Sequence, residues 1–198
     1  MECRYLLQSQ AFNKVEDIKV KNINIQDIAH SLSLQCRFNG HISRFYSVAE
    51  HSVLVMRCVT EYISLPKSAL LLGALLHDGN ECYVGDIARP ILNWIKEQNP
   101  RGTYGVLDIN WLYGHFRELV DVKFQIHLIP EEYKIIKMAD NFMLDIEGKK
   151  FFEDRWNGDN ISKSLYHTWH NRIQCLPPKD AKNLFLKEFR DVYKQNDS

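Results

Sequence analysis

The sequence predicts an all-α fold in a single domain. Three observations support this prediction: apolar residues recur at helical spacing in most of the chain, strand signals are weak throughout, and 198 residues suffice for one sizeable core. Hydrophobic residues make up 45% and charged residues 25% of the chain, which is the composition of an ordinary soluble globular protein.

Six segments are predicted to be helical from their periodicity and their end signals. They are residues 24–34, 48–63, 67–83, 106–121, 131–153 and 179–194. Ser47 and Glu50 form the pattern of a capping box at the start of the second segment. Pro130 suits the first helical position of the fifth, and residues 154–162 are expected to form a loop after it.

Charge and cysteine content exclude several classes of protein. Lys and Arg total 25, as do Asp and Glu, so the balance disfavours binding of extended nucleic acid but leaves a pocket for a small phosphate ligand open. Five widely spaced cysteines without a CxxC pair fit free thiols in a reducing compartment. The apolar run 69–76 is too short to cross a membrane, and the N-terminus shows no signal-peptide pattern. We therefore expect a cytoplasmic protein without a membrane partner.

The stretch GALLHDGNECYVGD, residues 73–86, combines an apolar run with a cluster of charged side chains. His77, Asp78, Glu81 and Asp86 follow directly after the apolar residues. Burying carboxylates at the end of a core helix costs several kcal/mol each unless a partner compensates their charge. The pattern therefore indicates a compensating partner near this segment.

Two further polar residues lie on or beside apolar helical faces. His51 falls in a stripe with Val48 and Val55, where a single His is more often a hydrogen-bonded core residue than a ligand. Asp140 shares a face with Ile136 and Met143, where a single Asp is as often a surface residue.

Two imidazoles and two carboxylates on three predicted helices suit a divalent cation with nitrogen and oxygen ligands and one or two open positions. Such a cation would make the burial of the carboxylates favourable. These ligand types do not distinguish Zn, Co, Mn, Ni, Fe or Mg.

Three blocks of the sequence resemble the HD-domain metal-dependent phosphohydrolases. They are CRFNGHISRFYSVAEHSVLV, ALLLGALLHDGNECYVGDIARPI and IIKMADNFMLDIE. The blocks are similar to the small helical subgroup that holds bacterial 5′-deoxynucleotidases and phage dATP triphosphohydrolases. This resemblance implies a single HD-domain helical bundle over residues 1–198, with a metal- and nucleotide-binding core at 24–150 and a C-terminal helical extension at 151–198.

The resemblance also implies roles for individual residues. His51, His77, Asp78 and Asp140 match the H…HD…D pattern and would be ligands of one catalytic metal. Glu81, with Asp78, would serve catalysis by orienting or activating the attacking water. The other reading of Glu81 is a helix cap or a surface ion pair.

Residues expected to contact the substrate flank this pattern on both sides. An Arg-aromatic pair would orient the phosphate and pack on the nucleoside, an Asp would lie near the sugar, and the residues after it would line the nucleotide site. In order along the chain these residues are Arg37, Phe38, Asp86, Ile87, Ala88, Arg89 and Pro90.

The expected activity is hydrolysis of a deoxynucleotide, in one of two reactions, and a third alternative is not an enzyme. A dATP-type triphosphohydrolase would release deoxynucleoside and triphosphate, whereas a 5′-deoxynucleotidase would act on dNMPs. A nucleotide-binding regulatory module is the non-enzymatic alternative, and the presence of all four ligands disfavours it. The triphosphate is favoured by five candidate cations, Arg37, Arg44, Arg89, Lys96 and Arg101.

We also expect a homo-oligomer, a dimer or larger, with the aromatic-rich segment 104–116 as a candidate interface. A second metal ion could accompany the substrate.

Overall fold

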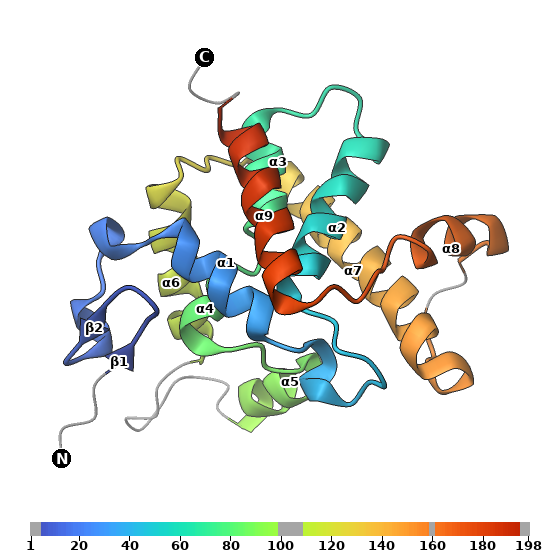
Figure 1. Ribbon diagram of the computed structural model, residues 1–198, viewed down its shortest axis with the longest axis horizontal. Coiled ribbons are helices and arrows are strands. Elements are labelled where there is room, and N and C mark those ends of the chain that lie inside the picture. Colours follow the sequence, from blue (N-terminus) through green and yellow to red (C-terminus); the bar gives the residue numbers. More distant parts are fainter. Residues whose placement is uncertain (1–4, 99–108, 159–160, 195–198) are drawn as a thin grey trace.

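Helices account for nearly all the regular structure, which confirms the all-α prediction (Figure 1). The computed structural model describes residues 5–98, 109–158 and 161–194. The helices are α1 Ile25–Leu34, α2 Val48–Tyr62, α3 Ser68–Leu75, α4 Glu81–Val84, α5 Arg89–Gln98, α6 Ile109–Lys123, α7 Pro130–Phe152, α8 Lys163–His170 and α9 Pro178–Tyr193. Short 3₁₀ turns cover Val15–Asp17, Val20–Asn22, Arg37–Gly40 and Glu153–Arg155, and the two-residue strands β1 Tyr5–Leu6 and β2 Ala11–Phe12 pair antiparallel.

Helix α2 is the centre of the bundle. It packs against α1, α3, α7 and α9, and its residues from Val48 to Met56 are all buried. Helix α9, red in Figure 1, lies against α1, α2 and α3 and buries Phe185 and Phe189 there. The C-terminal extension is therefore part of the same core that carries the candidate ligands.

The predicted capping box at the start of α2 is half correct. The Ser47 hydroxyl accepts a hydrogen bond from the Glu50 backbone N–H at 3.1 Å, as an N-cap should. The Glu50 carboxylate does not return to Ser47. It instead accepts three backbone N–H groups between α8 and α9, from Gln174, Cys175 and Leu176, at 2.7–3.1 Å. One buried carboxylate thus fastens the C-terminal segment to α2.

The predicted helix over residues 67–83 is wrong as one continuous element. Helix α3 ends at Leu75, a turn follows, and α4 begins only at Glu81. The residues His-Asp-Gly-Asn at 77–80 explain the break, because Asp, Gly and Asn favour turns over helix interiors. Within the turn the Gly79 N–H donates to Leu76 O at 2.9 Å and the Glu81 N–H donates to Asp78 O at 2.9 Å.

Two helices were not predicted. Helix α5 follows the turn at Gly85, whose φ of +84° suits glycine, and α8 follows the loop after α7. The remaining predicted helices agree with α1, α2, α6, α7 and α9 within a few residues, although 106–108 lie outside the described residues.

In the part of the chain that the structure describes, no helix is both long enough and apolar enough to cross a membrane.

We predict that Glu50→Ala lowers the free energy of unfolding by about 3 kcal/mol, because three backbone N–H groups lose their charged acceptor, the buried Glu50 carboxylate. Urea denaturation measures this change. Glu61→Ala on the same helix is the matched control, since Glu61 makes only an exposed ion pair with Arg172 and should cost less than about 1 kcal/mol. Equal losses in the two variants would contradict the fastening role of Glu50.

Candidate metal centre

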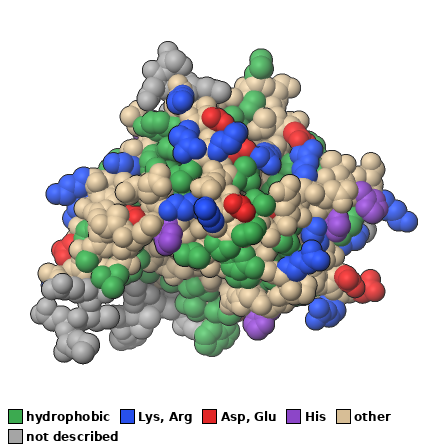
Figure 2. Space-filling model, viewed as in Figure 1, with side chains coloured by type: hydrophobic (Ala, Val, Ile, Leu, Met, Phe, Trp, Pro, Cys, Tyr) green, Lys and Arg blue, Asp and Glu red, His purple; other side chains and the backbone are tan. Residues whose placement is uncertain are grey.

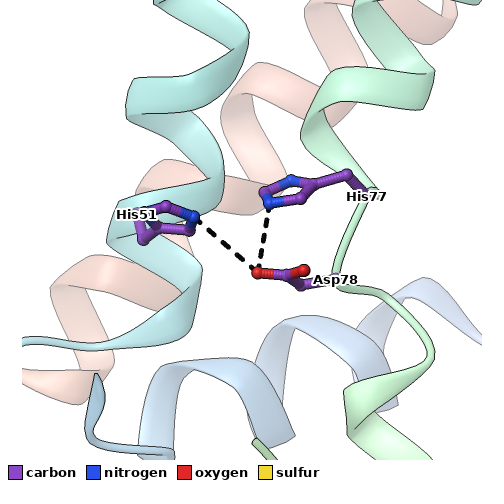
Figure 3. Close-up of side chains that lie close together, drawn as sticks. All are labelled: His51, His77 and Asp78. Carbon is purple, nitrogen blue, oxygen red and sulfur yellow. Dashed lines mark ion pairs between the residues drawn. The ribbon is translucent and has the colours of Figure 1, made fainter. Parts of the chain in front are cut away.

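His51, His77 and Asp78 converge on one point (Figure 3). His51 comes from α2, whereas His77 and Asp78 come from the turn between α3 and α4. Asp78 Oδ2 lies 3.1 Å from His77 Nε2 and 3.8 Å from His51 Nε2. One ligand atom from each side chain lies within 4.8 Å of the other two, so this group could hold a metal ion.

Asp140, on α7, approaches the same point from the other side. Its Oδ1 lies 3.3 Å from His51 Nε2 and 3.8 Å from His77 Nε2. The Asp140 residue is 7% exposed, so it faces the core and not the surface. The structure therefore brings all four predicted ligands together, from three helical regions far apart in the sequence.

Both imidazole rings are fixed by hydrogen bonds at Nδ1. His77 Nδ1 lies 2.9 Å from Ala74 O, and His51 Nδ1 lies 2.6 Å from Glu147 Oε1. A carbonyl oxygen and a carboxylate can only accept, so each Nδ1 carries the proton and donates it. In the neutral rings each Nε2 then turns a lone pair toward the two aspartates, which is the orientation a metal ligand needs.

The unsatisfied polar atoms of the core gather at this point. Among the described residues, four buried side-chain atoms have no hydrogen-bond partner: His51 Nε2, His77 Nε2, Glu81 Oε2 and Tyr83 Oη. Such atoms are rare in folded proteins because each one costs free energy. Three of these four belong to the candidate centre, so the residues fit a divalent cation, which would satisfy the two nitrogen atoms directly.

The two aspartates and the two imidazoles shift one another's pKa values in the directions that favour a positive charge at the centre. Burial alone would lower the pKa of His77, but Asp78 and Asp140 outweigh it and raise the pKa to about 9. Burial would raise the pKa of Asp78, but the two imidazoles lower it to about 2. A cation held by the two Nε2 atoms would occupy the positions that protons take in the metal-free centre, so metal binding would be favoured as the pH rises.

Glu147, on α7, lies behind His51 and has no role predicted from the sequence. It is fully buried, and its Oε1 accepts from Tyr46 Oη at 2.7 Å as well as from His51. Arg37 donates to its Oε2 from Nε at 3.1 Å and from Nη2 at 2.9 Å. The apolar spacing around Glu147 could signal burial, but nothing in the local sequence indicates its partners 96 to 110 residues away.

Arg37 and Phe38 lie differently from the expected pair of phosphate and nucleoside contacts. Arg37 is buried and bound to Glu147, and only its Nη1 faces the centre, 4.0 Å from Asp78 Oδ2. Phe38 has a positive φ of 55° and packs edge-on against Phe151, Phe152 and Trp156. In this structure Arg37 is bound to the carboxylate that orients His51, and Phe38 belongs to an aromatic cluster beside the end of α7.

Glu81 and Asp86 are held by the side chain of Gln35. Gln35 Nε2 donates to the Glu81 carbonyl oxygen at 3.1 Å, and its Oε1 accepts from the Asp86 backbone N–H at 2.9 Å. The pKa of Glu81 is raised well above its usual range by burial and by the charges of Asp78 and Asp86. Because α3 ends at Leu75 and α4 begins at Glu81, His77 and Glu81 do not lie on one continuous helix. The turn nevertheless keeps Glu81 close enough to Asp78 for the charge of Asp78 to raise the pKa of Glu81.

Positive charge lies at the outer edge of the centre. Arg89 Nη2 and Lys137 Nζ both contact Asp140 Oδ2, at 3.2 Å and 2.7 Å. Arg89 Nη1 also donates to Asn141 Oδ1 at 3.0 Å. Lys137 and Asn141 were not assigned roles from the sequence, although both belong to the block IIKMADNFMLDIE that resembles the family.

The other predicted contacts are spread along the chain. Ile87 and Ala88 lie between Gly85 and α5, and Pro90 is exposed in the first turn of α5. Arg44 is exposed, and its charge acts on Lys150 and Cys175. Arg101 lies outside the described residues, as does the side chain of Lys96.

Comparison with known proteins finds two relatives. The chain is similar to YfdR, an uncharacterized protein of Escherichia coli, with 29% identity over 179 residues that cover 89% of this chain and 88% of YfdR. It is also similar to an uncharacterized protein of Rhodobacter capsulatus, with 40% identity over 72 residues, or 35% of this chain and 37% of that protein. No protein-family profile matches the sequence. Neither relative's description states an activity, so the function has to be argued from the site.

We predict that Asp140→Ala folds but loses bound metal, because the apolar neighbours of Asp140 stay in place while the carboxylate facing both Nε2 atoms is removed. Metal content after dialysis against Mn, Co or Zn measures this. Asp154→Ala is the control, since Asp154 is exposed on the turn after α7. Full occupancy in Asp140→Ala would remove Asp140 from the ligand set.

We predict that Glu147→Gln weakens metal affinity by about 10- to 100-fold, the usual effect of removing the carboxylate partner of a histidine ligand. Competition with a fluorescent chelator measures the dissociation constant. Glu131→Gln, in the exposed first turn of α7, should leave the constant unchanged. An unchanged constant in Glu147→Gln would mean that the ring of His51 is oriented by packing alone.

Proposed function

We propose that the chain is a metal-dependent phosphohydrolase of the HD-domain type, acting on deoxynucleotides. The observation that carries this proposal is the pair of imidazoles whose buried Nε2 atoms lack partners and face Asp78 and Asp140. The order of these residues along the chain, and the sequence blocks around them, resemble that family.

A divalent cation held by His51, His77, Asp78 and Asp140 would polarise a phosphoryl oxygen and lower the pKa of a water molecule. Glu81 is the candidate general base, because its Oε2 is buried, lacks a hydrogen-bond partner among the described residues and belongs to a carboxyl with a raised pKa. In the reaction, water adds its oxygen to the α-phosphorus, the bond from that phosphorus to the 5′ oxygen breaks, and the 5′ oxygen takes up a proton.

The arrangement of cations bears on the choice between triphosphate and monophosphate. Of the five cations expected to hold a triphosphate, Arg89 lies at the edge of the centre, while Arg37 is engaged by Glu147 and Arg44 is exposed near Cys175. A triphosphate needs several cations besides the metal. Arg89 and Lys137 are the described cations in contact with Asp140 at the edge of the centre. The triphosphohydrolase is the first reaction to test, with the 5′-deoxynucleotidase as its alternative.

Hydrolysis of every dNMP and dNTP by the metal-loaded protein separates the alternatives. Release of inorganic phosphate from dNMPs identifies the nucleotidase, and release of triphosphate from dNTPs identifies the triphosphohydrolase. Inactivity with Mn, Co, Mg and Zn would support the regulatory module instead.

We further propose that the protein acts in the cytoplasm as a homo-oligomer. Trp111, in the described part of the candidate interface 104–116, is 55% exposed, and Trp94 on the adjacent α5 is 60% exposed. Large exposed aromatic side chains of this kind are frequent at protein interfaces.

We predict that Glu81→Gln lowers the turnover number by about 10²- to 10⁴-fold, because the amide keeps the shape of the side chain but cannot accept the proton. Metal content and nucleotide affinity should stay near wild type, since the ligands are untouched. Steady-state kinetics and metal analysis measure these quantities, with Glu97→Gln on the exposed side of α5 as control. Loss of affinity with an unchanged turnover number would make Glu81 a binding residue.

A further inference from the structure

A pocket of about 290 Å³ opens on α7 next to the metal centre. It is lined by Arg89, Asn141, Leu144, Asp145, Asn157 and Gly158. None of these residues is among the metal ligands, and only Arg89 was expected at the substrate. The pocket joins three separate parts of the chain: the start of α5, the middle of α7 and the loop that follows α7.

Arg89 and Asn141 connect this pocket to the metal centre. The Arg89 guanidinium contacts Asp140 through Nη2 and Asn141 through Nη1. With a rise of about 1.5 Å per residue, Asp145 lies about 7.5 Å along α7 from Asp140. Asp145 is also turned by about 140° around the helix axis from Asp140, so the pocket and the centre lie on different faces of α7. Arg89 contacts residues of both faces, Asp140 and Asn141, and is the link between the two sites.

Trp156 fixes the position of the loop residues Asn157 and Gly158, which line one side of the pocket. Its ring covers Gly148, where an added Cβ would lie 2.1 Å from the indole, and it stacks on Phe152. Its Nε1 donates to Asp145 Oδ1 at 3.1 Å. At Gly158 an added Cβ would lie 2.1 Å from Asp145 Oδ1. The loop backbone therefore passes so close to the bond between Trp156 and Asp145 that any residue larger than glycine would collide with Asp145. Two close contacts at glycine thus hold the loop onto α7.

The polar groups of the pocket form an acceptor and a donor one turn apart. Asp145 is four residues after Asn141, which places both side chains on the same face of α7, about 5–6 Å apart at Cβ. Trp156 occupies Asp145 Oδ1, so Oδ2 is the acceptor left for a ligand. Arg89 occupies Asn141 Oδ1, so the amide NH₂ is the donor left for a ligand.

This pair favours a base edge on which an exocyclic amino donor stands beside a ring-nitrogen acceptor. Adenine and cytosine offer an amino donor beside a ring-nitrogen acceptor, and Asp and Asn are the side chains that read such edges. Thymine has carbonyl oxygens on both sides of its only N–H, and a carboxylate repels them. Leu144 supplies the apolar contact for the face of the base.

We propose that this pocket binds the base of the nucleotide and selects adenine or cytosine over thymine through Asp145. The identity of the ligand rests on the proposed function, but the binding of a base can be measured without any hydrolysis.

The test uses free deoxynucleosides, which carry no phosphate ester to cleave. Trp156 is a built-in reporter because its indole N–H is bonded to Asp145, and only four tryptophans contribute indole signals to the NMR spectrum. We expect deoxyadenosine and deoxycytidine to shift the Trp156 indole resonance at concentrations about tenfold lower than thymidine does. Trp156→Phe assigns that resonance.

Asp145→Asn supplies the decisive variant, because it keeps the size of the side chain while offering an NH₂ group to the ligand. We expect the preference for amino-bearing bases to disappear, and Asp154→Asn, exposed and outside the pocket, to retain it. Should Asp145→Asn misfold, Asn157→Trp at the exposed mouth replaces it and should weaken binding of every deoxynucleoside.

Equal shifts with thymidine, or no shift at Trp156 with any deoxynucleoside, would overturn the proposal. Base-selective binding without hydrolysis would support the pocket and contradict the proposed enzyme. Hydrolysis that is indifferent to Asp145→Asn, with no shift at Trp156, would support the enzyme and contradict the pocket.

Discussion

Glu147 carries a carboxylate with no exposed surface, and donors from three separate segments surround it: Arg37, Tyr46 and His51. A buried charge is tolerated only when its partners compensate it fully, and loss of one partner leaves the others uncompensated. Because one of these donors is the Nδ1 group of a candidate ligand, the requirement to satisfy Glu147 also sets the direction of His51 Nε2. The same hydrogen bonds of Glu147 therefore fix both the packing of α2 against α7 and the geometry of the candidate metal centre.

A second constraint is the break between α3 and α4. A continuous helix would place His77 and Asp78 about 100° apart around one axis, whereas the turn directs both toward α2 and α7. Gln35 at the end of α1 holds the far side of this turn through Glu81 and Asp86. The end of α1 thus packs against α4 and helps to determine where Glu81 lies, although Gln35 is not one of the candidate ligands.

The sequence predicts local features of this molecule better than its long-range contacts. The N-cap at Ser47 and the start of α7 at Pro130 depend on neighbours within four residues, and both are present. The capping pattern predicted that the Glu50 carboxylate accepts from the Ser47 backbone N–H. The carboxylate instead accepts from three backbone N–H groups more than 120 residues away, which a local pattern cannot indicate. Arg37 shows the same limit, because its charge suggested a phosphate contact while the buried Glu147 occupies most of its donors. The convergence of His51, His77, Asp78 and Asp140 was predictable because their residue types and the apolar helical faces beside them both mark these positions.

Asp140 divides its two oxygens between different tasks. Oδ1 faces the imidazoles, while Oδ2 receives Arg89 and Lys137 at the outer edge. A cation bound at the centre would draw electron density toward Oδ1 and weaken the hold of Oδ2 on those side chains, which frees Arg89 for an anion arriving from outside. Arg89 also donates to Asn141, so a cation at the centre would act on the guanidinium, and through it on the neighbouring pocket, by way of one carboxylate. Such coupling is reciprocal by thermodynamic necessity: whatever the cation does to the affinity for a ligand at Arg89, that ligand does equally to the affinity for the cation.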